Sequence, residues 1–171
     1  MISRAEILAK MMWGIMNETE LRQLESTISP GSVIVADSGN GPFEQALLDG
    51  RHVLRADEPV AVGGKDSGPG PYELLLMALG ACTSMTLRMY ATRSQWPLEN
   101  VVVRLSHARV YAADCQDCES ERAQLSRIHR SIELIGPLDA KQRARLMQIA
   151  DMCPVHRTLT SKIDIRTELV V

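Results

Sequence analysis

The sequence predicts an α+β fold in which an antiparallel sheet covers one long central helix. Three observations support this prediction. Short, partly alternating segments occur within residues 33–56, an almost wholly apolar helical segment spans residues 71–93, and two longer alternating segments span residues 101–112 and 126–135. Strands that precede and follow the helices, without a regular strand–helix alternation, are typical of α+β domains.

Size and composition fit one ordinary globular domain. The chain has 171 residues, of which 45% are apolar and 23% are charged, and its formal net charge is −2. A chain of this length buries roughly 70% of its extended surface, which is enough for one core. The near-neutral charge and the aromatic content of 4% provide neither a phosphate-attracting surface nor stacking platforms. We therefore expect no nucleic-acid partner.

Neither an export signal nor a membrane span is expected. Arg4, Glu6 and Lys10 interrupt the apolar residues at the N-terminus, whereas a secretory signal needs an unbroken apolar run. The longest uncharged run, residues 74–87, is shorter than the roughly 18 to 20 residues that cross a bilayer. We expect a cytoplasmic protein whose four cysteines are reduced thiols, metal ligands or redox groups rather than a disulfide framework.

Residues 1–31 are predicted to be a helical extension, and residues 32–171 the main domain. Apolar residues recur at helical spacing in residues 4–15 and again in residues 21–28, and a proline–glycine pair ends the region. The apolar stripe is too narrow to form a core of its own. The extension should therefore pack on the main domain or on a partner subunit.

The main domain is predicted to begin with a small antiparallel meander. Residues 33–36, 45–48 and 52–56 are short and partly alternating, as half-buried strands are. Asp49 and Gly50, between the second and third segments, form a pair typical of tight hairpins.

A loop rich in glycine and proline, residues 63–71, separates the meander from the long helix. Its glycines most simply serve chain geometry, because no phosphate-binding or dinucleotide fingerprint is present. Pro71 suits the first turn of a helix, which should run to about Arg93. Because this helix is apolar almost all round up to Arg88, we expect other structure on most of its sides.

The rest of the chain is predicted to add strands and a second helix. Residues 101–112 and 126–135 alternate and are rich in β-branched residues, so they read as two longer strands. Residues 139–152 are amphipathic, with Asp139 as a plausible N-cap. Apolar residues at spacings of two or four in residues 163–171 predict a closing strand.

Cys82 lies in the middle of the predicted long helix. Leu75, Leu79, Met85 and Met89 lie three or seven positions away on the same face. On position alone, a buried and inert cysteine is the simpler interpretation. The residue lies about ten positions past the helix start, on the order of 15 Å, so a reactive thiolate here would need a nearby cation.

Cys153 has a different setting, because Pro154 follows it and could begin one more helical turn. Cys153 would then be the N-cap of that turn. Backbone N–H groups and the neighbouring His156 and Arg157 would favour a thiolate at this position. The alternative is a cysteine that merely ends the preceding helix.

Cys115 and Cys118 form a pair with the spacing of half a zinc site. Zinc needs four ligands, so His107, His129 or another subunit would have to complete the set. Acidic neighbours disfavour a fast nucleophile in this loop. A solvated loop without a metal is the favoured interpretation, with a metal site and a redox pair as the alternatives.

Two stretches of the sequence together resemble a known family. They are Gly68-Pro-Gly-Pro-Tyr-Glu-Leu-Leu-Leu-Met-Ala-Leu-Gly-Ala-Cys82-Thr-Ser-Met-Thr-Leu and Ala150-Asp-Met-Cys153-Pro-Val-His-Arg-Thr-Leu159. Both are similar to the OsmC/Ohr family of osmotically inducible and organic hydroperoxide resistance proteins. The resemblance runs from about Ser32 to the C-terminus. Residues 52–59 and 114–119 look like the branch whose OsmC domains are also found fused to α/β-hydrolases.

The resemblance implies an intertwined α+β homodimer with two active sites at its interface. Each site would reduce organic hydroperoxides without a cofactor, with Cys82 as the peroxidatic thiol and Cys153 as the resolving thiol. The two would form a disulfide that an external dithiol reductant reopens. An apolar pocket beside Cys82 would admit an alkyl or fatty-acid peroxide. Its candidate walls are Leu75, Leu79, Met85 and Met89.

The sequence departs from the pattern of the best-known peroxidase branches. There, a glutamate directly follows the proline eleven residues before the peroxidatic cysteine and holds an arginine beside the thiolate. Here Tyr72 follows that proline and Glu73 stands one place later, a rotation of about 100° on a helix. Residues 40–43 lack the early-strand arginine. The candidate supporting residues are Tyr72, Glu73, Arg51, Arg55, His156 and Arg157.

These departures favour a second interpretation. The chain could be a non-enzymatic OsmC-like module that binds an apolar or electrophilic ligand in the same interface pocket. In that case a peroxide would leave both thiols reduced.

Overall fold

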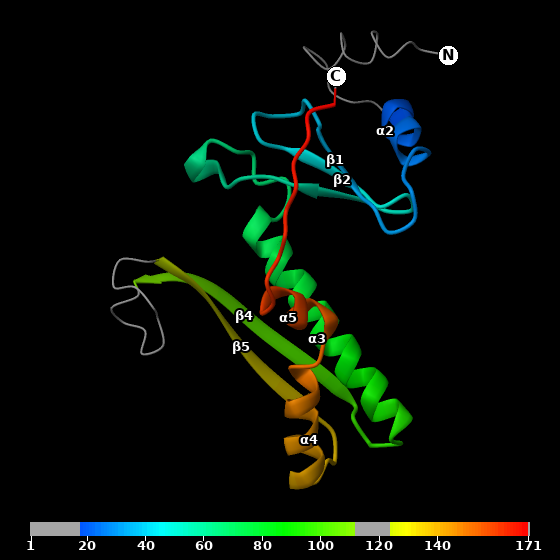
Figure 1. Ribbon diagram of the computed structural model, residues 1–171, viewed down its shortest axis with the longest axis vertical. Helices are drawn as coiled ribbons and strands as arrows, with labels where there is room; N and C mark the ends of the chain where they lie inside the picture. Colours follow the sequence, from blue (N-terminus) through cyan, green and yellow to red (C-terminus); the bar gives the residue numbers. More distant parts are fainter. Residues whose placement is uncertain (1–17, 112–123, 171) are drawn as a thin grey trace. The chain divides into compact units, whose positions relative to one another are not determined.

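A computed structural model describes residues 18–111 and 124–170 of the chain (Figure 1). The chain divides into two compact units, one ending at Leu74 and the other beginning at Leu75. One long helix, α3, starts in the first unit and continues through the second. The predicted helix in residues 4–15 lies outside the described residues. The boundary predicted near Ser32 stays a prediction.

The first unit contains a short helix and the predicted antiparallel meander. Its elements are α2 (Glu18–Glu25), β1 (Ile34–Asp37), β2 (Gln45–Leu48), β3 (Val53–Ala56) and the 3-10 turn η1 (Val60–Val62). The strands form one sheet in the order β1-β2-β3, with antiparallel pairs throughout.

Asp49 closes the hairpin between β2 and β3, as predicted. Its carboxylate accepts hydrogen bonds from the backbone N–H of Arg51 at 2.9 Å and of His52 at 2.7 Å. The His52 ring also lies 2.9 Å from this carboxylate. The ring and the two N–H groups lower the pKa of Asp49.

The glycine-rich loop is shaped by close backbone approaches. A Cβ on Gly64 would lie 1.8 Å from the carbonyl oxygen of Glu58, and one on Gly68 would lie 2.5 Å from that of Arg55. No side chain fits at either distance, so both positions require glycine. The prediction that these glycines serve chain geometry is confirmed at these two positions.

The long helix α3 spans Pro71–Arg93, as predicted. Proline occupies its first position, and Glu73 accepts a hydrogen bond from the backbone N–H of Gly70 at 2.9 Å. Beyond its end, Gln95 adopts a φ of 55°. A left-handed residue after the last turn is a common helix terminator, although glycine is the usual choice.

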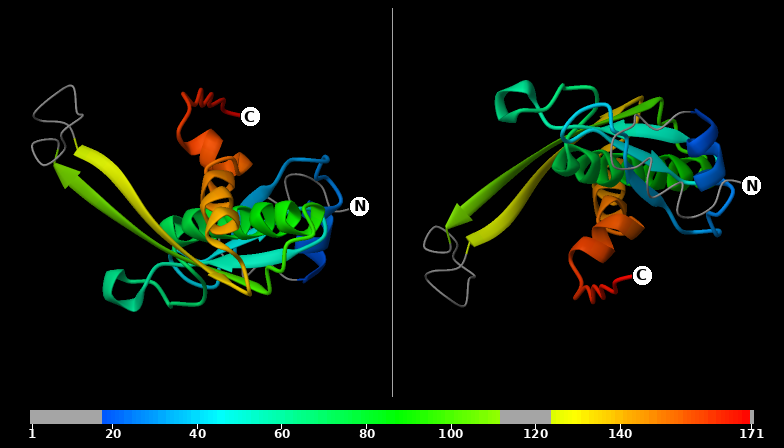
Figure 2. Two further views of the ribbon diagram at one scale, coloured as in Figure 1. Left: turned by 90° about the horizontal axis from the view of Figure 1, so that it is seen from below. Right: turned by 90° about the horizontal axis from the view of Figure 1, so that it is seen from above.

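The second unit places two long strands and two helices along α3 (Figure 1). β4 (Asn100–Tyr111) and β5 (Gln124–Ile135) pair antiparallel and form a ribbon that extends past the helices (Figure 2). α4 (Ala140–Ala150) follows, with Asp139 as its N-cap, as predicted. Asp139 and Gln142 also form a reciprocal pair of side-chain to backbone hydrogen bonds. α5 (Pro154–Leu159) is the short final helix.

The core of the second unit lies between α3, α4 and the start of the ribbon. Leu87 and Leu146 are fully buried there, from α3 and α4 respectively. The further buried members of this cluster are Ala91, Leu98, Leu138, Ile149 and Ala150. Burial of these apolar side chains holds the second unit together.

One expectation about α3 is wrong for the single chain. Its buried residues are Leu79, Thr83, Leu87 and Ala91, which recur every fourth position and form one stripe. Met77, Met85 and Met89 are mostly exposed. The described elements cover only one side of the helix, whereas its apolar composition predicted cover on most sides.

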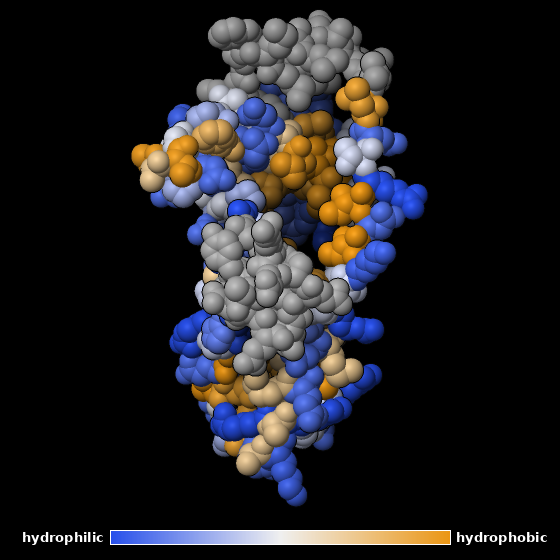
Figure 3. All heavy atoms as spheres, turned by 60° about the vertical axis from the view of Figure 1, so that its left-hand side comes forward, coloured by the Kyte–Doolittle hydropathy of each residue, from blue (hydrophilic) through white to orange (hydrophobic). Residues whose placement is uncertain are grey.

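Two expectations about the strands are also wrong for the single chain. The five described strands form two sheets, not one. Residues 162–170 form no strand, and Ile165 and Leu169 are 83% and 88% exposed. Figure 3 shows hydrophobic side chains interspersed with polar ones along this segment, at the right of the view. A strand needs hydrogen bonds from a neighbouring strand, which no described strand supplies here.

Candidate functional site

Cys153 is a buried thiol at the N-terminus of α5. Its side chain is 0% exposed, and its Sγ accepts a hydrogen bond from the backbone N–H of His156 at 3.3 Å. The extended backbone of Cys153 and the proline that follows it set up this geometry. The predicted role of Cys153 as a helix N-cap is confirmed.

Thr83 joins α3 to this thiol. Its hydroxyl is fully buried and lies 3.6 Å from Cys153 Sγ, close enough for a hydrogen bond to sulfur. The same oxygen lies 2.8 Å from the carbonyl of Leu79, one turn earlier in α3. A threonine hydroxyl in a helix commonly bonds back to such a carbonyl.

Arg130 brings a cation to the same place. Its Nη1 donates to Thr83 Oγ1 at 3.0 Å and to the carbonyl of Ala150 at 3.3 Å. Its Nη2 donates to Asp151 Oδ1 at 2.7 Å. The Arg130 side chain is only 12% exposed, so its charge lies largely inside the second unit. Arg130 thus links β5 to α3 and to the turn that precedes Cys153.

Sequence reasoning missed Arg130, although a signal was available. Ile128, Arg130, Ile132 and Leu134 occupy alternate positions of β5, and all four are partly buried. A cation between isoleucines on the inward face of a strand is unusual, because a buried charge needs a partner. Only the structure could identify the groups that pair with Arg130.

Cys82 immediately precedes Thr83 in α3, so their Cα atoms are about 3.8 Å apart. On a helix, the two side chains point about 100° apart. Cys82 is partly exposed, whereas Cys153 is buried, and both are free thiols. Among the described residues, no hydrogen bond reaches Cys82 Sγ.

A cavity of about 400 Å³ adjoins the Thr83 and Cys153 pair. Three of its lining residues each bond to that pair: Leu79 and Arg130 to Thr83, and His156 to Cys153. The full lining is Leu79, Ser126, Ile128, Arg130, His156, Leu159 and Thr160. An apolar wall with a few convergent polar groups is typical of a small-molecule site.

The other predicted site residues of the second unit do not gather in one place. Leu79 lines the cavity, Leu75 is half-buried, and Met85 is exposed. Met89 is exposed at a separate cavity of about 410 Å³, which Thr86, Tyr90, Arg93, Ile149 and Met152 also line. Arg157 is exposed on α5. Their predicted roles around Cys82 stay predictions.

The remaining predicted residues lie in the first unit. Glu73 bonds to the backbone of Gly70, as described above, and Tyr72 is 48% exposed. Arg51 is exposed at the hairpin turn. Arg55 donates to Glu44 at 2.8 Å. The first unit therefore engages Glu73 and Arg55 in its own contacts.

Glu44 is a fully buried carboxylate of the first unit. Its oxygens accept hydrogen bonds from Ser67 at 2.6 Å, Arg55 at 2.8 Å, Ser38 at 2.9 Å and Asn40 at 3.0 Å. The Ser67 hydroxyl and these other donors outweigh burial and lower the pKa of Glu44. The interaction with Ser67 ties the glycine-rich loop to the sheet.

Asp57 also holds the glycine-rich loop. Its carboxylate accepts backbone N–H bonds from Ser67 at 3.2 Å, Lys65 at 2.9 Å and Glu58 at 2.8 Å. Burial raises the pKa of Asp57, but these N–H groups outweigh it and lower the pKa below its ordinary value.

Within residues 18–111 and 124–170, no three histidine, cysteine or acidic side chains gather as metal ligands would. Cys115 and Cys118 lie outside those ranges. The alternative of a zinc site at these two cysteines stays a prediction.

Comparison with solved structures shows the same fold at low identity. An organic hydroperoxide resistance protein OsmC from Legionella pneumophila is 18% identical, with 80% of this chain and 94% of that chain covered and a TM-score of 0.56. An OsmC-like protein from Mycoplasma pneumoniae is 16% identical, with coverages of 75% and 84% and a TM-score of 0.56. The organic hydroperoxide resistance protein OhrB of Bacillus subtilis is 16% identical, with coverages of 78% and 92% and a TM-score of 0.53.

Comparison with curated proteins finds no match. The sequence profile described as OsmC-like protein, however, matches residues 64–168. That range contains α3 with Cys82 and Thr83, Arg130 on β5, and the Cys153 cap of α5. The α+β architecture, with antiparallel sheets and a long central helix, agrees with this match. The chain belongs to the OsmC-like protein family.

Proposed function

We propose that this protein is a thiol-dependent peroxidase that reduces organic hydroperoxides, with Cys82 as the peroxidatic and Cys153 as the resolving cysteine. The main support is one contact: Thr83, the residue after Cys82, lies 3.6 Å from Cys153 Sγ. The partly exposed Cys82 is accessible to a substrate, and the buried Cys153 is shielded from it. Two structural relatives carry the name organic hydroperoxide resistance protein.

The chemistry balances with two thiols and one external reductant. The Cys82 thiolate attacks the terminal oxygen of ROOH, and the O–O bond breaks. Cys82 becomes a sulfenic acid that carries the hydrogen of the hydroperoxide, and the departing alkoxide takes a proton from water to become the alcohol ROH. The Cys153 sulfur then attacks Cys82 Sγ, an S–S bond forms, and the hydroxyl leaves as water. A dithiol reductant reopens the disulfide by exchange and is itself oxidised.

A homodimer is part of this proposal. The methionines on the uncovered side of α3 and the apolar side chains of residues 162–170 are exposed in the single chain. By length and composition, α3 could also cross a membrane. We assign its uncovered side to a second copy, because the opposite side already packs in a core with Leu146 and Ile149 of α4. The proposal also includes a cytoplasmic location. It further includes membership of the branch whose OsmC domains are also found fused to α/β-hydrolases.

The test treats the reduced protein with a slight excess of an organic hydroperoxide, or of hydrogen peroxide in parallel. Disulfides are mapped by mass spectrometry in the wild type, in Cys82→Ser and in Cys153→Ser. The proposal expects a Cys82 to Cys153 disulfide that forms faster with the organic peroxide. In Cys153→Ser, Cys82 should accumulate as a sulfenic acid that dimedone traps. In Cys82→Ser, Cys153 should stay reduced.

The second candidate is a non-enzymatic module that binds an apolar or electrophilic ligand. It is favoured by the absence of a hydrogen bond to Cys82 Sγ among the described residues and by the engagement of Glu73 and Arg55 elsewhere. If both thiols stay free under peroxide, this candidate replaces the peroxidase. A ligand would then be sought in the cavity beside Thr83 and Cys153.

A further inference from the structure

We infer that Arg130 is a positioning residue for the second step of the proposed reaction, acting on Cys153 through the Thr83 hydroxyl. The inference rests on the proposed function, since it concerns how the resolving thiol attacks the Cys82 sulfenic acid. It assigns a role to Arg130 on β5 and to Thr83 on α3, two residues that the two-cysteine chemistry does not itself require.

The hydrogen bonds of Thr83 can take two arrangements. A hydroxyl has one hydrogen and two lone pairs, and the Nη1 hydrogen of Arg130 occupies one lone pair. With Cys153 as a thiol, the S–H can donate to the other lone pair while the Thr83 hydrogen goes to the Leu79 carbonyl. With Cys153 as a thiolate, the Thr83 hydrogen can turn to Sγ. All groups keep a partner in the first arrangement, and the sulfur gains a donor in the second.

In the second arrangement, Cys153 Sγ accepts hydrogen bonds from two directions. The backbone N–H of His156 donates from α5 and the Thr83 hydroxyl donates from α3. Arg130 strengthens the hydroxyl as a donor, because a hydroxyl that accepts from a cation becomes more polarised. A sulfur held from two sides keeps a defined position beside Thr83, the residue that follows Cys82 in α3.

Arg130 is buried enough for its charge to act strongly on the Thr83 hydroxyl. The Arg130 side chain is 12% exposed, so solvent screens its charge only weakly. Its ion-pair partner Asp151 is 66% exposed. The Ala150 carbonyl takes a further hydrogen bond and fixes the guanidinium against the end of α4.

The step that this arrangement assists is disulfide formation. The Cys153 thiolate donates its electron pair to Cys82 Sγ, the S–O bond of the sulfenic acid breaks, and the leaving hydroxide takes a proton to become water. No oxidant beyond the hydroperoxide already used is required. The step is intramolecular, so its rate constant does not depend on peroxide concentration.

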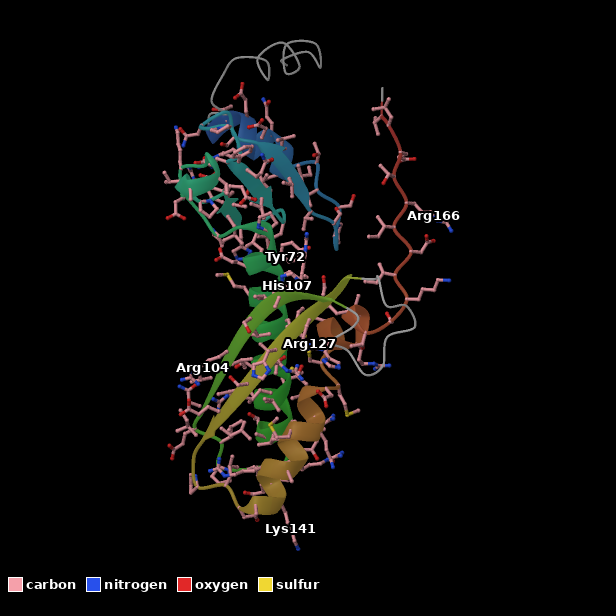
Figure 4. All side chains as sticks on the ribbon, turned by 90° about the vertical axis from the view of Figure 1, so that its left-hand side faces the viewer. Tyr72, Arg104, His107, Arg127, Lys141 and Arg166 are labelled. Carbon is pink, nitrogen blue, oxygen red and sulfur yellow. The ribbon has the colours of Figure 1, made fainter. Side chains whose placement is uncertain are left out.

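The test measures that rate constant directly in stopped-flow mixing, at peroxide concentrations where the first step is no longer limiting. Thr83→Val removes the hydroxyl at nearly constant shape, and Thr83→Ser restores it. Arg130→Met removes the cation, and Arg130→Lys keeps a charge. Arg104→Met serves as the matched control, because Arg104 lies on the same ribbon and pairs with Glu133 on an exposed face (Figure 4). Quenched samples are assayed for dimedone-trapped Cys82 and for the disulfide.

We expect Thr83→Val and Arg130→Met to slow disulfide formation about tenfold or more, the effect of losing a hydrogen bond to an ionised group. Trapped Cys82 sulfenic acid should accumulate accordingly. Thr83→Ser should recover most of the rate, Arg130→Lys part of it, and Arg104→Met should match the wild type. If Arg130→Met fails to fold, the comparison of Thr83→Val with Thr83→Ser tests the inference by itself.

Two different failures can be told apart. Disulfide formation at the wild-type rate in Thr83→Val would overturn the inference and leave the peroxidase proposal intact. Wild-type protein that yields neither a sulfenic acid at Cys82 nor a disulfide would overturn the proposed function itself.

Discussion

Glu44 and Arg55 form a 2.8 Å ion pair in which the glutamate side chain is fully buried and the arginine side chain is 59% exposed. Arg104 and Glu133 form a pair of the same length across β4 and β5, with both side chains more than half exposed. The two pairs differ in burial and in the number of other donors. Their comparison separates the effect of a buried carboxylate from that of an exposed ion pair.

Glu44→Gln should destabilise the protein by about 2 kcal/mol, because its amide NH₂ would face hydrogen-bond donors instead of accepting from them. Glu133→Gln should change the free energy of unfolding by less than about 0.5 kcal/mol, as is typical of exposed pairs. Urea denaturation followed by circular dichroism measures both. Equal effects of the two substitutions would show that Glu44 does not stabilise the first unit.

The lowered pKa values of Glu44 and Asp57 predict acid sensitivity. Both carboxyls have a pKa in the folded state below their ordinary values of 4.5 and 3.8. They therefore contribute stability that is fully present above those values and is lost as pH falls through and below them. Urea midpoints should fall steeply below about pH 4.5. Glu44→Gln should have a shallower pH dependence there, and an unchanged slope would contradict the assignment.

Gly64 and Gly41 offer a matched pair in the first unit. A Cβ on Gly64 would overlap the backbone oxygen of Glu58, whereas the atoms nearest to one on Gly41 belong to the flexible side chain of Lys65, the first at 3.3 Å. Gly64→Ala should cost about 3 kcal/mol, because backbone has to move. Gly41→Ala should stay within about 0.5 kcal/mol of the wild type. Thermal unfolding of both variants checks this, and a tolerated Gly64→Ala would mean that the loop is freer than described.

Elements defined by short-range chemistry were predictable from the sequence. Asp49 and Gly50 indicated the β2–β3 hairpin, Pro71 the start of α3, and Asp139 the start of α4, and all three are confirmed. Cys153 as a cap was predictable for the same reason, since the cap depends on the three residues that follow it.

Features that depend on distant partners were not predictable. The apolar alternation in residues 163–171 indicates a strand but not its neighbour, and the single chain offers none among its described strands. The sequence marks Arg130 only by its charge at an inward position of β5, and Arg130 was not among the predicted site residues. Its link to Thr83 spans 47 positions of sequence and depends on how β5 packs on α3. Arg51, Arg55 and Arg157 were therefore the named candidates, although Arg130 is the arginine that reaches the threonine beside Cys82.

The exposed methionines of α3 provide a test of the proposed dimer. Met85→Glu places a charge on the uncovered side of the helix, where Met85 is 65% exposed in the single chain. Sedimentation velocity should show a wild type of twice the 18.9 kDa chain mass and a Met85→Glu variant shifted toward monomer. Lys141→Glu, at the exposed end of α4 (Figure 4), should stay dimeric. A wild type that is monomeric, or that stays in solution only with detergent, would contradict the assignment of the uncovered side of α3 to a second copy.

Cys153 should be replaceable by serine but not by alanine without loss of stability. Its Sγ accepts the His156 N–H that begins α5, and serine is among the best N-cap residues. Cys153→Ala leaves that N–H and the Thr83 hydroxyl without this partner and should cost about 1 kcal/mol. Cys153→Ser should recover most of that loss in thermal unfolding under reducing conditions. Equal losses in both variants would indicate that packing of the sulfur, not the cap, holds α5 in place, and Cys153→Ser would then be a poor probe of the resolving thiol.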